Sequence, residues 1–134
     1  MRKVWFLLPC SLLLLIAISI VACGNGNGNR QLQSITVSPA SARSQAQFTA
    51  TGKYTDGSTV SPLTALWSQD NPWIKAQIVP VEIVVDSTTG MASCGSIAGT
   101  FTVDATAPVD PHFPVSQMQP TTPQVSGTAQ LTCP

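Results

Sequence analysis

The chain has 134 residues, of which 43% are hydrophobic and 9% charged, with six basic and six acidic side chains and a single histidine. This length suits one domain, and the composition is too apolar for a disordered protein and too poor in charge for a coiled coil. The balanced charge leaves no basic surface for nucleic acid, and one histidine cannot build a histidine-rich metal site. Eleven prolines and nine glycines favour a β-rich fold.

The N-terminal residues have the build of a secretory leader. Arg2 and Lys3 precede an uncharged run over residues 4–21, and small residues then lead to Cys23. An uncleaved transmembrane anchor is the alternative, because eighteen apolar residues nearly suffice to span a bilayer. Pro9 inside the run and the small residues before Cys23 favour a leader that is removed.

The end of this leader, IVAC, resembles the lipobox of bacterial lipoproteins. The resemblance implies that residues 1–22 are a signal peptide cut before Cys23, whose thiol carries a diacylglyceryl group and whose new amine is acylated. Several acyl chains would anchor the protein firmly in a membrane. Because Gly24 rather than Asp follows Cys23, the analogy with Gram-negative lipoproteins implies a place in the cell envelope, at the outer membrane or cell surface.

Two cysteines remain in the exported part once Cys10 leaves with the leader and Cys23 is acylated. In an oxidising compartment, Cys94 and Cys133 are expected to form a disulfide. This bond would close a loop of about 40 residues and contribute roughly 4 kcal/mol in the chain-entropy model. The alternative is a pair of free, buried thiols.

A tether and a series of short strands follow Cys23. Residues 24–31 (GNGNGNRQ) predict a flexible tether with a mean reach of about 15 Å, which with Cys23 leaves a domain over residues 32–134. Strands are predicted over residues 32–37, 47–54, 64–68, 76–86 with a break at Pro80, 100–106 and 127–133. Asp56-Gly57 is the strongest turn signal.

Alternation within these strands predicts which side chains are buried. In the first strand, Leu32, Ser34 and Thr36 fall on one side and Ile35 and Val37 on the other. The residues expected to face inward elsewhere are Phe48, Ala50, Gly52, Tyr54, Phe101, Val103, Ala105, Ala129 and Leu131; Thr100, Thr102, Asp104 and Thr106 are expected to face outward. About seven strands without helical periodicity predict an antiparallel β-sandwich, with residues 107–125 as a long, proline-rich irregular loop.

The order of these features resembles a bacterial immunoglobulin-like domain of group 2, as in intimin- and invasin-like adhesins. The matching stretches are LQSITVSPASA (32–42), QFTATGKYTDGST (47–59), LWSQDNP (66–72), GMA (90–92), GTFTVDAT (99–106) and GTAQLTC (127–133). The resemblance implies an all-β, immunoglobulin-like sandwich with Trp67 in its core. Residues 73–86 and 107–125 are longer than the family pattern, and such loops are where an individual function would be added.

No catalytic residue is predicted. His112 is the only candidate for a general base at neutral pH, and a triad would also need a nucleophilic Ser or Thr and an acid such as Asp110 or Asp104. No G-x-S-x-G is present, and Asp110 and His112, two residues apart, are not expected to face each other as a triad requires. An exposed loop histidine is the simpler interpretation.

The remaining chemistry predicts no metal and no cofactor. The six acids, Asp56, Asp70, Glu82, Asp86, Asp104 and Asp110, form no calcium-loop motif, and a small sandwich offers no evident cleft for a pair of catalytic carboxylates. Cys94, Cys133 and His112 fall one ligand short of a closed zinc site. The GNGNGN run precedes no helix, which argues against a phosphate-binding loop.

Two aromatic side chains remain as candidates for binding. Trp73 and Phe113 lie in irregular segments and, if exposed, could stack on sugars or anchor a protein; the alternative is that they cap the ends of the sandwich. With His112 they form the candidate binding loops. The sequence predicts a non-enzymatic, lipid-anchored envelope protein that binds or presents an envelope or surface protein, as in adhesion. The alternative is a surface carbohydrate-binding module that takes a glycan.

Overall fold

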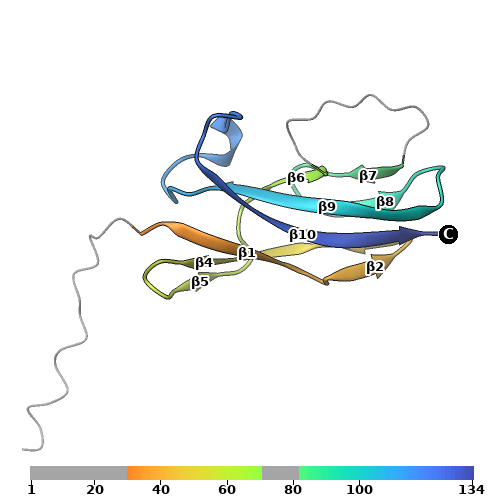
Figure 1. Cartoon of the computed structure of the whole chain (residues 1–134), viewed down its shortest axis with the longest axis horizontal. Helices are drawn as coiled ribbons and strands as arrows, with labels where there is room; N and C mark the ends of the chain where they lie inside the picture. The colour runs from red at the N-terminus through yellow and green to blue at the C-terminus, as the bar shows by residue number, and fades with distance from the viewer. Residues whose placement is uncertain (1–29, 71–81) are drawn as a thin grey trace, which may run out of the picture.

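The computed structural model describes residues 30–70 and 82–134, and these residues form ten strands and one 3-10 turn (Figure 1). The elements are β1 (Leu32–Ser38), β2 (Ser41–Arg43), β3 (Gln45–Gln47), β4 (Thr49–Tyr54), β5 (Thr59–Val60), β6 (Leu66–Gln69), β7 (Ile83–Val85), β8 (Met91–Cys94), β9 (Gly99–Pro108), η1 (Val115–Gln117) and β10 (Gln124–Cys133). The predictions for the signal peptide, Cys23, Trp73 and residues 76–81 fall outside the described residues.

The strands form three sheets, ordered β1–β4–β5, β3–β8–β7 and β2–β10–β9–β6. The first two sheets continue each other, because only Phe48 separates β3 from β4 and its backbone N–H donates to the Gly90 carbonyl (3.0 Å). They make one layer of a sandwich, and the four-stranded sheet makes the other. All pairings are antiparallel except that of β2 with β10. The predicted all-β sandwich is confirmed.

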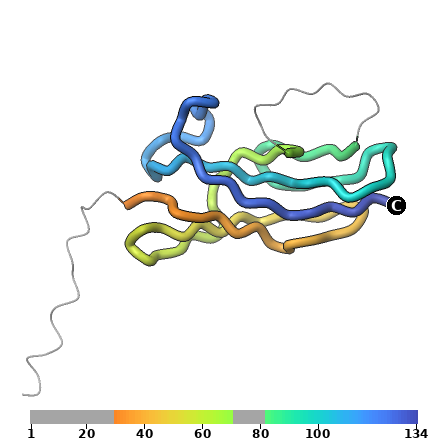
Figure 2. Tube along the Cα trace, in the orientation of Figure 1, coloured from red at the N-terminus to blue at the C-terminus, as the bar shows by residue number. Residues whose placement is uncertain are grey.

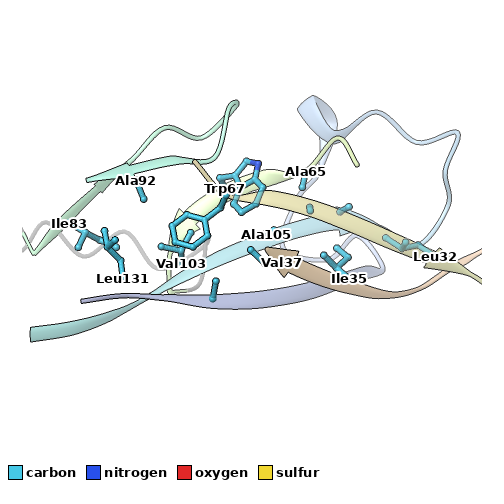
Figure 3. Packing of buried hydrophobic residues seen from close by; sticks show 14 of the residues in the cluster. Leu32, Ile35, Val37, Ala65, Trp67, Ile83, Ala92, Val103, Ala105 and Leu131 are labelled. Carbon is cyan, nitrogen blue, oxygen red and sulfur yellow. The ribbon is translucent and has the colours of Figure 1, made fainter. Parts of the chain in front are cut away.

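The core lies between the layers, and its centre was predicted correctly. Trp67, Phe48, Tyr54 and Val103 are each 5% exposed or less, and Trp67 lies among aliphatic side chains from both layers (Figure 3). The Trp67 ring packs so closely on the β7–β8 turn that a Cβ at Gly90 would lie 2.6 Å from it. Phe101 is only partly buried and packs against the edge of this cluster.

Two predicted burial patterns are wrong. Leu32 is buried together with Ile35 and Val37, because the register of β1 shifts between Leu32 and Ser34 and so returns Leu32 to the core side. Thr106 was expected to face outward in solvent but is completely buried. Its hydroxyl shares a hydrogen bond with Ser126 Oγ (2.9 Å), which satisfies the buried polar group.

Several strand limits also differ from prediction. The single strand expected over 47–54 is divided at Phe48, where the pairing partner changes from β8 to β1. The irregular loop is shorter than predicted and covers residues 109–123, because β9 and β10 remain paired out to Pro108 and Gln124. The short strands β2, β5 and β8 were not predicted, and β3 was predicted only at Gln47, since two to four residues of alternation give little signal.

Candidate functional site

The disulfide predicted from the cysteine count is present. Cys94 on β8 and Cys133 on β10 are bonded, with their Cα atoms 5.5 Å apart. The bond joins one layer of the sandwich to the other, beside the backbone hydrogen bonds from Ser44 N–H to the Thr132 carbonyl (3.0 Å) and from Cys94 N–H to the Ser44 carbonyl (2.9 Å). The structure therefore has a bonded pair at this place and not two separate thiols.

The sandwich has two unlike ends (Figure 2). The disulfide end carries Cys133 and the turn before β9. The entry end is where the described chain begins, and it carries the start of β1, the β4–β5 turn and the proline-rich loop over 109–123. The Leu32 N–H donates to the Val109 carbonyl (2.8 Å), which joins the first strand to that loop.

A groove opens at the entry end, between the β4–β5 hairpin and the proline-rich loop. It has a volume of about 340 Å³, and its lining includes Tyr54, Val60, Leu63, Phe113 and Val115. We call it the entry groove. The groove is lined by both the predicted loop residue Phe113 and the predicted core residue Tyr54. Val60 and Val84 are the two large hydrophobic side chains that are exposed in the described part of the chain.

Arg30 lies beside Tyr54 and fixes the incoming chain to this end. Its guanidinium carbon lies 3.9 Å from the centroid of the Tyr54 ring, and its Nε lies 3.4 Å from Asp56 Oδ2. The neighbouring Gln31 N–H donates to Thr55 Oγ1 (3.1 Å), and the Thr55 N–H donates to the Gln31 carbonyl (2.9 Å). Arg30 and Gln31 therefore belong to the ordered end of the sandwich, although the sequence assigned them to the tether.

His112 and Asp110 do face each other, which corrects the expectation that two residues so close in sequence would not. The His112 ring Nδ1 lies 3.2 Å from Asp110 Oδ1, and the same oxygen accepts the His112 backbone N–H (2.9 Å). The imidazole is 90% exposed. No Ser or Thr hydroxyl of the described residues is hydrogen-bonded to it, so this contact shapes the loop without completing a triad.

Three exposed carboxylates accept hydrogen bonds within turns. The Ser58 hydroxyl and backbone N–H lower the pKa of Asp56, the backbone N–H groups of Thr89 and Thr88 lower that of Asp86, and the backbone N–H of His112 lowers that of Asp110. In each case the cause is hydrogen bonding that favours the charged carboxylate. The Glu82 carboxylate accepts a hydrogen bond from the Gln69 side-chain amide.

Asp104 is the exception among the acids. It lies half-buried on β9, and burial raises its pKa above the ordinary value, while hydrogen bonds from Thr106 and Ser126 partly oppose that rise. No group of three His, Cys, Asp or Glu side chains within residues 30–70 and 82–134 is placed to hold a metal ion. Across the same residues, no helix is long and apolar enough to cross a membrane.

The outer side of β9 and β10 is polar and almost uncharged. Thr100 and Thr132 lie opposite each other with their hydroxyl oxygens 3.2 Å apart, and Asp104 pairs with Thr128. We call this surface, made of Thr100, Thr102, Asp104, Ser126, Thr128, Gln130 and Thr132, the hydroxyl face. The alternation in the sequence predicted that the β9 residues of this face point outward, and it was wrong only for the buried Thr106. It did not predict that the face continues across β10.

No family model matches the chain, and no curated protein shows significant similarity to it. The immunoglobulin-like resemblance read from the sequence therefore stays a prediction. Sequence reasoning missed Arg30, Val60 and Leu63 as site residues; the only signal for Arg30 is that it is the first charged side chain after the Gly/Asn run.

Proposed function

We propose that this chain is a non-enzymatic, lipid-anchored module of the bacterial cell envelope that binds a protein partner. The disulfide between Cys94 and Cys133 carries the proposal, because such bonds persist in oxidising compartments outside the cytosol. The leader over residues 1–22 and the lipobox-like ending at Cys23 support the same route of export. The order of strand motifs supports an immunoglobulin-like domain of group 2.

The hydroxyl face is the surface that we assign to the partner. Thr128 is exposed near its middle, and Thr100, Ser126 and Gln130 are exposed around it. Their uncharged hydroxyl and amide groups suit a protein interface held by direct and water-mediated hydrogen bonds. The disulfide and the strand pairing hold this face rigid, which reduces the entropy lost on binding.

Intact mass spectrometry of protein extracted from bacterial membranes tests the anchor. The expected mass lacks residues 1–22, is lower by the two hydrogens lost in forming one disulfide, and includes acyl chains on Cys23. A mass that still contains the leader would contradict lipid anchoring and support the transmembrane alternative.

Cross-linking of the full chain in cells tests the partner surface. Thr128→Arg places a long charged side chain in the middle of the hydroxyl face and is expected to remove the cross-linked partner. Thr59→Arg makes the same chemical change on β5, away from this face, and is expected to leave it unchanged. Equal capture by both variants would contradict the assignment to the hydroxyl face.

A second hollow supports carbohydrate binding as the alternative. It has a volume of about 370 Å³, and its lining combines the hydroxyl-bearing Thr49, Thr64 and Thr88 with Leu63 and Trp67. Sugars bind at such mixtures of hydroxyl and apolar groups. Binding on a glycan array that is lost with Thr64→Val and kept with Thr128→Arg would favour this alternative over a protein partner.

A further inference from the structure

The described chain is fixed to the entry end from its first residue. Arg30 stacks on Tyr54 at 3.9 Å and pairs with Asp56, Gln31 exchanges two hydrogen bonds with Thr55, and β1 starts immediately afterwards. The length of chain available to separate the sandwich from Cys23 is therefore counted from Arg30 rather than from the first strand.

That length is short. Seven peptide steps join Cys23 to Arg30 (30 − 23 = 7). They span at most about 25 Å when fully extended. A ten-residue strand such as β9 is about 33 Å long. An anchor at Cys23 therefore keeps the entry end within about 25 Å of the bilayer, whereas the disulfide end can lie about one strand length farther out.

We propose that the entry end rests on the membrane surface, with Val60 and Phe113 at the mouth of the entry groove in contact with lipid. This inference rests on the proposed anchoring at Cys23. A tether this short confines the sandwich to a thin layer above the bilayer, where its effective concentration is in the millimolar range or above. Contacts too weak to hold the free domain on a membrane are sufficient there.

The chemistry of the entry end favours an uncharged lipid surface. Val60 is 36% exposed, Phe113 is half-buried, and Pro62, Pro111 and Pro114 line the same groove. The charged groups nearby are Arg30, which Asp56 neutralises, the exposed Lys53 on β4, and Asp110 beside His112. No excess of positive charge attracts anionic headgroups, so the contact is apolar and suited to zwitterionic lipid.

This orientation changes the role of the proline-rich loop. The sequence named His112 and Phe113 as candidates for partner binding, but a loop held against the bilayer is covered. The hydroxyl face lies along the side of the sandwich, on β9 and β10, and it stays open to a partner while the entry end touches lipid. The membrane contact and the protein contact therefore use different surfaces.

Fluorescence quenching on vesicles tests the orientation. The full chain is produced in bacteria, purified from membranes, checked by intact mass and placed in phosphatidylcholine vesicles that contain brominated acyl chains. Phe113→Trp adds a reporter at the entry groove, and Ala98→Trp adds one at the exposed turn of the disulfide end. The emission added by Phe113→Trp is expected to be largely lost on bromination, and that added by Ala98→Trp to persist.

The outcomes separate this inference from the proposal beneath it. Val60→Trp reports on the same groove and replaces Phe113→Trp if that variant does not fold. Equal quenching at both ends in an anchored protein would overturn the membrane contact alone. A protein recovered without acyl chains and without its leader would overturn the anchoring and the membrane contact together. A protein that keeps its leader but shows the expected quenching would overturn lipidation and support the orientation.

Discussion

The two ends of the sandwich are held in different ways. At the disulfide end a covalent bond links β8 to β10, and hydrogen bonds from Ser44 and Cys94 close the same corner. At the entry end the incoming chain is held by the Arg30 guanidinium and a few hydrogen bonds, and a groove separates the hairpin from the loop. The end closed by the covalent bond is therefore the one farther from the proposed anchor at Cys23.

This division fits the proposed roles of the two regions. A surface that presents a rigid sheet to a partner benefits from a covalent link between layers, since less conformational freedom is lost on binding. An end that lies on a fluid bilayer needs apolar contact more than fixed geometry. Four predictions probe this contrast, and they decrease in expected effect.

Loss of the disulfide should have the largest effect. Replacing both Cys94 and Cys133 by Ser opens a loop whose ends are 39 residues apart in sequence. The free energy of unfolding is expected to fall by about 4 kcal/mol, chiefly because the unfolded chain gains entropy. Urea unfolding of the oxidised parent and the double variant measures the change. A loss below about 1 kcal/mol would mean that the corner is held without its covalent bond.

A pair of glycine variants compares close packing with backbone strain alone. Gly90 and Gly57 both have positive φ, at +76° and +82°, but a Cβ at Gly90 would lie 2.6 Å from the Trp67 ring and 2.9 Å from the Phe48 carbonyl oxygen. Gly57 has nothing within 4 Å. Gly90→Ala is expected to cost about 3 kcal/mol from strain and overpacking together, and Gly57→Ala about 1 kcal/mol from strain.

Thermal and urea unfolding of both glycine variants would check this difference. Equal losses would show that the β7–β8 turn can shift away from Trp67, and that the core near the middle of the sandwich is as adaptable as the turn at the entry end.

The parts of this fold that the sequence predicted are those set by local alternation or by counting. The buried face of Phe48, Ala50 and Tyr54 follows from the two-residue period of a strand. The disulfide was predicted because the expected loss of Cys10 with the leader and the expected acylation of Cys23 leave one pair of cysteines. The prediction from alternation was wrong at Leu32, because the register shift there depends on the partner strand and cannot be recognised in the sequence of β1 itself.

The entry groove shows why the candidate site was harder to predict. Its walls come from Tyr54, Leu63 and Phe113, which belong to three separate segments of the chain. No periodicity brings such segments together; only the folded topology does. Arg30 was missed for the same reason, because its partners Tyr54 and Asp56 lie more than twenty residues further along the chain.

Removal of Arg30 should loosen the entry end without affecting the disulfide end. Arg30→Ala loses a cation–π contact worth about 0.5–1 kcal/mol and an exposed ion pair worth up to about 1 kcal/mol, so a total near 1 kcal/mol is expected. Hydrogen exchange should accelerate at the amides of Leu32 and Thr55. Arg43→Ala, an exposed arginine on β2, is the matched control and should leave both amides unchanged. Unchanged exchange in Arg30→Ala would show that backbone bonds alone fix the chain.

Two acids, one at the entry end and one on the hydroxyl face, should respond to pH with opposite sign. Hydrogen bonds from Ser58 lower the pKa of Asp56, so its charge stabilises the fold at neutral pH, and that contribution is lost as pH falls through the lowered pKa. Burial raises the pKa of Asp104 above its ordinary 3.8, so the folded protein binds the proton more readily and the charged form costs stability at neutral pH.

At pH 7, Asp56→Asn should lower the melting temperature. Asp104→Asn should raise it, by an amount worth less than about 1 kcal/mol because solvent screens a half-buried carboxylate. Both differences should shrink in melts recorded down to pH 3, and a melting temperature lowered by Asp104→Asn at pH 7 would show that its hydrogen bonds with Thr106 and Ser126 outweigh the cost of burial.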